Sequence, residues 1–141
     1  MHWMLLPLKR YADFNGRSRR TEYWMFHLAI VIALFAVVAG IFASVATPRD
    51  QPGEFPVALG ILIGVFTIAW LGLIIPSLAV QVRRFHDQDL SGWFVLLGFV
   101  PYVGALVIIV FMCLPGTKGD NRYGPDPLDP EGVERLGKVF G

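Results

Sequence analysis

Three long uncharged stretches dominate the pattern of hydrophobic and polar positions along the chain. No Asp, Glu, Lys or Arg occurs at residues 23–48, 55–82 or 90–117. A helix needs roughly 20 consecutive apolar residues to cross the ~30 Å hydrocarbon core of a bilayer. A soluble domain would instead carry charges on the outward faces of its amphipathic elements. The pattern therefore predicts an all-α integral membrane protein with three hydrophobic helical segments.

The first two stretches predict crossings at about residues 23–46 and 55–82. The link between them, residues 47–54, contains Pro48 and the pair Pro52-Gly53, which interrupt helix and favour a turn. The first stretch is longer than the ~7–15 apolar residues of a secretory signal and follows a long polar segment, so we expect it to be retained. The two crossings then form an antiparallel pair.

The third stretch, residues 93–114, leaves two alternatives open. It is long enough for one crossing and too short for two. Pro101 lies between Gly98 and Gly104, a composition that breaks a helix. The stretch is therefore predicted to be either a crossing kinked at Pro101 or a re-entrant hairpin that turns there.

Basic residues flank these stretches unequally. Five precede the first stretch, one (Arg49) lies in the first link, and two (Arg83 and Arg84) follow the second. Because Lys and Arg are retained on the cytoplasmic side, the N-terminal segment 1–22 and the second link are predicted to be cytoplasmic. Four more basic residues follow the third stretch. A crossing there divides the basic residues seven to five between the two sides, whereas a hairpin divides them eleven to one.

The C-terminal part is predicted to be an extended tail. Residues 115–127 are rich in Gly, Pro, Asn and Asp, which favour turns over helix or strand. We expect residues 1–127 to form a single multi-pass membrane domain and residues 128–141 to be a mobile tail.

Small residues predict where the helices pack. Gly60 and Gly64 form a GxxxG pair that Gly72 continues, and Gly40 lies on a small-residue face of the first span. Such faces allow close backbone approach within a bilayer, either inside one chain or between copies. Pro76 is predicted to kink the second span and to free the carbonyl of Gly72, for which the Ser77 hydroxyl is a nearby donor.

Composition excludes several classes of protein. The chain has 141 residues, a net charge of +1 and a single cysteine, Cys113. These values exclude a disulfide-rich secreted scaffold and a basic nucleic-acid-binding protein, so no nucleic-acid partner is expected.

The candidate chemistry lies in three polar clusters at the ends of the apolar stretches. Arginines and acids at this density favour charge-assisted pairs between clusters on the same side of the membrane, and their positive charge favours anionic headgroups. The predicted interfacial network comprises Arg17, Arg19, Arg20, Glu22, Arg83, Arg84, His86, Asp87 and Arg122.

Catalytic and metal chemistry are not predicted. His86 and Asp87 are adjacent and so project in different directions, and no GxSxG motif accompanies Ser91. His86 has no second His or Cys at ligand spacing, so neither a metal nor another cofactor is expected. His27, inside the first span near its predicted cytoplasmic end, is interpreted as an interfacial or hydrogen-bonded histidine, and a role in proton transfer is the alternative.

The three clusters, in order, carry a family resemblance. They are FNGRSRRTEYW at 14–24, RRFHD at 83–87 followed by SGW at 91–93, and PGT at 115–117 followed by NRYGPDP at 121–127. Over about residues 8–127 the chain resembles the bacterial inner-membrane family called domain of unknown function 805. The resemblance implies a small multi-pass protein of the bacterial inner membrane, and it supplies no activity and no catalytic residues.

The hypothesis favoured by these patterns is a non-enzymatic scaffold that uses its cytoplasmic Arg/Asp network to bind anionic phospholipid headgroups or a partner. That partner is a second copy or another membrane protein. A component of an oligomeric small-solute transporter or channel is the alternative. A membrane enzyme acting on lipid headgroups is less favoured, because the repeated acidic motif of a diphosphate–magnesium site is missing.

Overall fold

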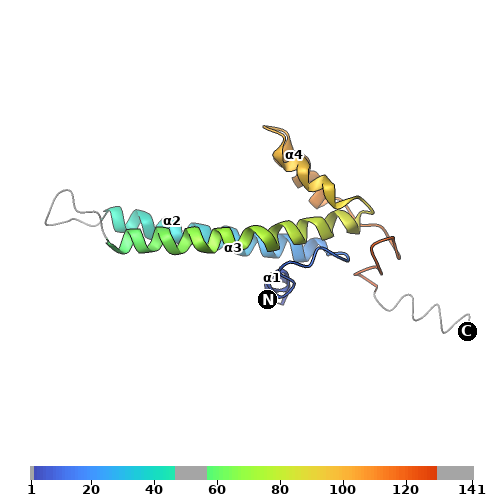
Figure 1. Ribbon diagram of the computed structural model, residues 1–141, viewed down its shortest axis with the longest axis horizontal. Helices are drawn as coiled ribbons and strands as arrows, with labels where there is room; N and C mark the ends of the chain where they lie inside the picture. The colour runs from blue at the N-terminus through green and yellow to red at the C-terminus, as the bar shows by residue number, and fades with distance from the viewer. Residues whose placement is uncertain (1, 47–56, 130–141) are drawn as a thin grey trace, which may run out of the picture.

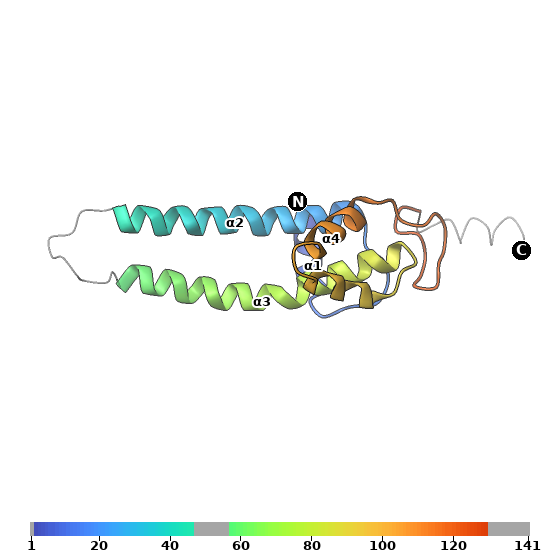
Figure 2. The same cartoon turned by 90° about the horizontal axis from the view of Figure 1, so that it is seen from above.

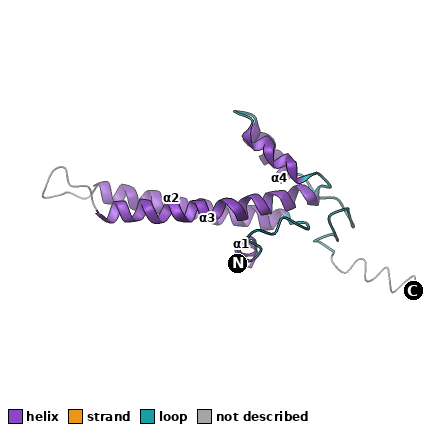
Figure 3. Cartoon of the chain, in the orientation of Figure 1, coloured by secondary structure: helices purple, strands orange, loops and turns teal. Residues whose placement is uncertain are grey.

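The computed structural model describes residues 2–46 and 57–129, and the regular elements found there are all helices (Figures 1 and 3). In chain order they are α1 (His2–Lys9), α2 (Arg20–Ala46), α3 (Val57–Asp87), the 3-10 helix η1 (Gly92–Phe99) and α4 (Gly104–Cys113). Among the described residues, only α2 and α3 are long and apolar enough to cross a membrane. This agrees with the predicted helical membrane protein.

Helices α2 and α3 lie side by side as a long antiparallel pair (Figure 2). Helix α2 begins at Arg20, and α3 continues to Asp87, beyond the predicted end of the second span at residue 82. The arginines expected on a link therefore lie on the last turns of α3. The predicted turn at 47–54 lies outside the described residues.

The predicted glycine faces do not meet inside this chain. A Cβ built at Gly40 would lie 3.5 Å from Leu62 Cδ2, so Gly40 does face α3. Gly60 is exposed, and a Cβ built at Gly64 would have no atom within 4 Å. The α3 face turned toward α2 carries larger side chains such as Leu62 and Phe66. Contact at Gly60 and Gly64 with a second copy stays a prediction.

The third apolar stretch is not one continuous helix but reverses direction at residues 100–103. Helices η1 and α4 are separated by the non-helical residues 100–103, where Tyr102 has φ +64° and is almost fully exposed. Both ends of the stretch lie at the end of α3. A Cβ at Gly92 would lie 2.8 Å from Val82 Cγ1, and Gln88 Nε2 donates to the carbonyl oxygen of Phe111 at 2.5 Å. The ends of a single crossing would lie ~30 Å apart, so these contacts agree with the hairpin alternative, and the course of the stretch relative to the membrane stays a prediction.

The two arms of this hairpin match in length and pack closely. Eight 3-10 residues rise about 16 Å and ten α-helical residues rise about 15 Å. A Cβ at Gly104 would overlap the carbonyl oxygen of Leu97, so the arms require glycine there. Figure 1 shows the hairpin leaning away from α3 on the side opposite α1.

Helix α1 was not predicted, and it brings a donor to the middle of α3. Helix α3 continues through Pro76, which has no N–H for the carbonyl of Gly72. The Tyr11 hydroxyl donates to that carbonyl oxygen at 2.5 Å, so Tyr11, and not the expected Ser77, is its recorded partner. The apolar run Met4-Leu5-Leu6 ahead of Lys9 was the available signal for this helix.

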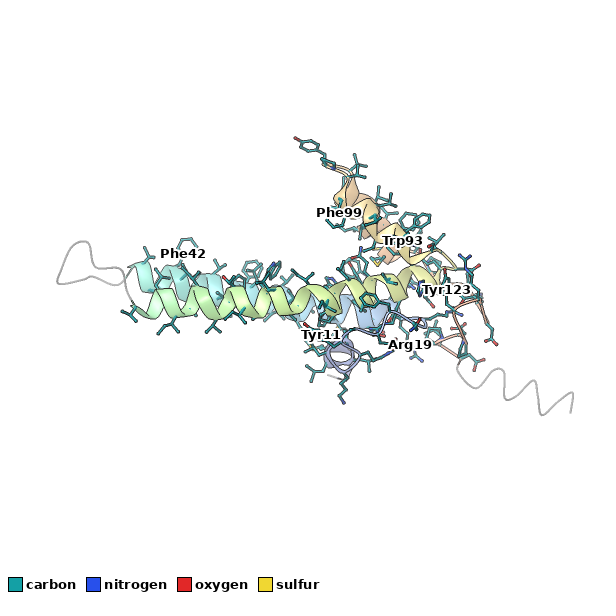
Figure 4. All side chains as sticks on the ribbon, in the orientation of Figure 1. Tyr11, Arg19, Phe42, Trp93, Phe99 and Tyr123 are labelled. Carbon is teal, nitrogen blue, oxygen red and sulfur yellow. The ribbon has the colours of Figure 1, made fainter. Side chains whose placement is uncertain are left out.

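The buried core lies at one end of the long pair. Its members come from α2, α3 and α4: Tyr23, Phe26, Val80, Phe85, Ile108 and Met112. Toward the other end both helices carry exposed apolar side chains, as with Phe42 at 71% (Figure 4), although Leu59 is buried there. Exposed apolar side chains on both long helices are expected where lipid is the surrounding solvent.

Candidate functional site

Three segments far apart in the sequence form a polar head at this end of the molecule. The polar head comprises residues 10–22, 83–92 and 114–129. Figure 4 shows Arg19 and Tyr123 at this end, while Phe42 lies at the opposite end of α2.

Arg83 anchors the N-terminal segment to α3. Its side chain is fully buried, and its Nη2 lies 3.0 Å from Glu22 Oε1. Nε donates to Ser18 Oγ at 3.1 Å and Nη1 donates to the carbonyl oxygen of Asp13 at 2.9 Å. The buried charge of Arg83 is thus paired and its donors are satisfied, which a buried guanidinium requires.

Asp87 lies between two buried guanidinium groups. Arg17 Nε donates to Oδ1 at 3.0 Å, and Arg84 Nη1 donates to Oδ2. All three side chains are at most 7% exposed. Arg84 also donates through Nη2 to the carbonyl oxygen of Leu114, whereas its Nε is buried with no hydrogen-bond partner among the described residues. One carboxylate therefore balances two arginines.

The same network holds the tail against α3. Arg17 donates to the carbonyl oxygens of Thr117 at 2.5 Å and Gly119 at 2.6 Å, and the Thr117 N–H donates to the Asp87 carbonyl at 2.8 Å. A Cβ at Gly116 would overlap the Asp87 carboxylate, so this approach requires glycine. All three sequence clusters therefore meet in one polar head.

An aromatic stack forms the outer edge of the head. The rings of His86 and Tyr123 are 3.8 Å apart and nearly parallel, and the Arg122 guanidinium lies 4.9 Å from the Tyr123 ring centroid. Arg122 also pairs with Asp89 at 3.1 Å, with both side chains about half exposed, so this pair contributes little to stability. Asn121 Nδ2 donates to the His86 carbonyl at 2.8 Å and fixes the tail turn against α3.

Asp126 is held ionised within the tail. Its carboxylate accepts the backbone N–H groups of Leu128 at 2.8 Å and Gly119 at 3.0 Å. These hydrogen bonds, with that from Leu128 the stronger influence, lower the pKa of Asp126 below its ordinary value.

The predicted network residues separate into two groups. Arg17, Glu22, Arg83, Arg84 and Asp87 are buried together. Arg20 and Arg122 are exposed, while Arg19 and His86 are partly exposed.

Arg20 Nη1 donates to the Cys113 carbonyl at 2.9 Å and so touches the end of the hairpin. Sequence reasoning missed the roles of Ser18, Gly116 and Thr117, although all three lie inside the quoted motifs.

His27 Nδ1 lies 2.9 Å from the carbonyl oxygen of Tyr23, which confirms a hydrogen-bonded histidine. The described part of the chain contains no group of three His, Cys, Asp or Glu residues that could hold a metal ion.

These observations define a class: a small helical membrane protein whose polar head is built around buried arginine–carboxylate pairs. The chain belongs to the family described as "Protein of unknown function (DUF805)", whose model matches residues 11–125 and so covers the whole network. The resemblance drawn from the three motifs is thereby confirmed.

Two relatives from Escherichia coli (strain K12) are similar over nearly their full lengths. Inner membrane protein YhaH is 45% identical over 131 residues, which cover 92% of this chain and 100% of that protein. Inner membrane protein YhaI is 43% identical over 130 residues, 90% of this chain and 96% of that protein. No solved structure matches the chain. The relatives' names agree with the inner-membrane location expected here.

Proposed function

We propose that this protein is a non-enzymatic scaffold of the bacterial inner membrane whose polar head lies on the cytoplasmic face and binds anionic lipid headgroups. The proposal rests mainly on the difference between buried and exposed basic residues. The buried arginines are occupied by internal partners, whereas Lys9, Arg20, Lys118 and Arg122 remain exposed around the head. Exposed basic residues near an anionic leaflet contribute about 1 kcal/mol each to membrane attraction.

The distribution of positive charge supports the cytoplasmic placement. Nine Lys and Arg residues belong to α1 and the polar head, whereas Arg49 is the single basic residue in the sequence between α2 and α3. This is the asymmetry expected of cytoplasmic segments.

The hairpin supports a head that is seated in the membrane surface. Trp93 and Phe99 are 76% and 77% exposed, and Figure 4 shows both on the outside of the hairpin. Arms of about 15 Å reach roughly half the thickness of the hydrocarbon core. Under this proposal the hairpin enters the cytoplasmic leaflet and returns, and only α2 and α3 cross.

The occupation of the carboxylates supports a non-enzymatic role. Glu22 and Asp87, the buried acids of the head, both accept hydrogen bonds from arginine. Both carboxylates therefore already serve as counter-ions to arginines inside the fold. The network is better suited to holding three segments in one shape than to general-base chemistry.

The lipids that copurify with the full chain test the proposal. After extraction in a mild uncharged detergent, we expect phosphatidylglycerol and cardiolipin to be enriched at least about two-fold over the bulk membrane. The enrichment is expected to fall at high salt, because attraction between exposed charges is screened. A lipid composition equal to that of the bulk membrane would overturn the proposal.

A further inference from the structure

A cavity of about 310 Å³ lies in the polar head beside the network. It is bounded by the start of α2, the end of α3 and the tail. Four of its lining residues are cationic: Arg19, Arg20, Arg84 and Lys118.

The acids that line the same cavity are already engaged. Asp87 accepts hydrogen bonds from Arg17 and Arg84. Asp126 accepts the N–H groups of Gly119 and Leu128. The positive charge of Arg20 and Lys118 is therefore not balanced by a carboxylate of the lining. The cavity favours an anion.

Two further features favour an anion at this position. The first is the N-terminus of α2, a helix of 27 residues that begins at Arg20. Its first N–H groups have no acceptors within the helix, and the helix dipole favours negative charge there. The second is Arg84, which lines the cavity and whose buried Nε has no hydrogen-bond partner within the described ranges. That Nε has almost no accessible surface, so the attraction of this wall for an anion comes from its charge: Arg17 and Arg84 share the single carboxylate of Asp87 and leave an excess of positive charge.

We infer that this cavity binds a phosphate group, with Arg20, Lys118 and the first turn of α2 as its ligands. The inference rests on the proposed function, because it names the part of a headgroup that the head recognises. Guanidinium and ammonium groups beside a helix N-terminus match the charge and the several acceptor oxygens of phosphate. The volume exceeds that of phosphate alone and so leaves room for the group that a phosphoester carries.

Thermal unfolding of the full chain in an uncharged detergent tests the inference. The probes are millimolar sodium phosphate against sodium chloride at equal ionic strength, and dioctanoyl phosphatidylglycerol against dioctanoylglycerol, which has the same chains and no phosphate. We expect a phosphate-bearing probe to raise Tm by at least about 3 °C, because a ligand bound only to the folded state stabilises it. A response to inorganic phosphate identifies a free phosphate as sufficient. A response to the lipid alone identifies a headgroup.

Matched variants locate the binding. The double variant Arg20→Gln/Lys118→Gln should lose the shift, and Arg20→Lys/Lys118→Arg should keep it. The charge-matched control Arg135→Gln/Lys138→Gln lies outside the described residues and should keep it too. An equal shift in Arg20→Gln/Lys118→Gln and wild type, or no shift with either phosphate probe, overturns the inference. If anionic lipid copurifies but the Tm shift of Arg20→Gln/Lys118→Gln equals that of wild type, the proposed phosphate site is wrong and the proposed lipid binding stands. If inorganic phosphate raises Tm but no anionic lipid is enriched on purification, the proposed lipid binding is wrong and the phosphate site stands.

Discussion

Asp87 is the residue on which the polar head depends most. It accepts hydrogen bonds from Arg17 and Arg84, its own carbonyl accepts from Thr117, and Gly116 packs against its carboxylate. A buried ion pair is weak evidence for stability by itself, but removing one member leaves an uncompensated buried charge. Here a single carboxylate serves two arginines, so its loss affects both.

Asp87→Asn should destabilise the protein by roughly 3–5 kcal/mol, because Arg17 and Arg84 would remain buried without a counter-ion. The free energy of unfolding in mixed micelles measures this. The control is Asp89→Asn, which removes a half-exposed partner of Arg122 and should cost no more than about 1 kcal/mol. Similar losses in the two variants would contradict the assignment.

The candidate residues and their pairing between clusters were largely identifiable from the sequence, but which of them are buried was not. Charge density and the motifs pointed to Arg17, Arg83, Arg84 and Asp87. Nothing local distinguishes these buried arginines from Arg20, which remains exposed. Burial depends on whether another segment supplies an acceptor, and that is a property of the fold.

At the scale of elements, α3 shows how a helix long and apolar enough to cross a membrane accommodates proline. An unsatisfied carbonyl is costly in lipid, so a freed one requires a donor from elsewhere. Tyr11 supplies it to Gly72 from the segment that follows α1. The segment that follows α1 therefore contacts α3 through the Gly72 carbonyl, which Pro76 leaves without an intrahelical donor.

A double-mutant cycle tests this link. Tyr11→Phe should cost about 1–2 kcal/mol of unfolding free energy in the wild-type background, because the Gly72 carbonyl loses its donor. In a Pro76→Ala background, the introduced alanine would supply an intrahelical N–H, so the same change should cost almost nothing. Equal costs in both backgrounds would show that the hydroxyl acts elsewhere.

The hairpin of η1 and α4 is predicted to place its tip, Tyr102, within the hydrocarbon core of the membrane. With Cys113→Ser removing the single native thiol, Tyr102→Cys places a cysteine at the tip. If the tip lies in the hydrocarbon core, membrane-impermeant maleimide added to either side should leave it unlabelled. Asp120→Cys, in the exposed part of the tail, is the positive control and should be labelled from the cytoplasmic side. Labelling of the tip from the periplasmic side would establish a crossing.

At the scale of the whole molecule, the tail contacts the N-terminal segment, so the two are predicted to share one side of the membrane. Arg17 contacts carbonyls of Thr117 and Gly119, which lie about a hundred positions later in the chain. These contacts cannot form across a bilayer. With an even number of crossings, both termini are predicted to face the cytoplasm.

Fusions at Gly141 check this arrangement in bacteria. Green fluorescent protein should fluoresce and alkaline phosphatase should be inactive, because each reporter works only on one side of the inner membrane. A pair truncated after Ala46, where one crossing precedes the reporter, should give the opposite result. Active phosphatase at Gly141 would contradict the shared polar head.

The sequence by itself determined the membrane class, two helices long and apolar enough to cross, the end at which positive charge collects, and the family. Each follows from local properties: the length of apolar stretches, the count of Lys and Arg, and short motifs. Only the tertiary structure decided that the third stretch turns back, that Tyr11 serves Gly72, and which arginines are buried. These outcomes depend on partners distant in sequence, 61 positions apart for Tyr11 and Gly72 and 70 for Arg17 and Asp87. Buried donors, acceptors and charges must each have a partner, and here the partners come from distant segments of the chain. A local stretch of sequence does not show which distant segment supplies them.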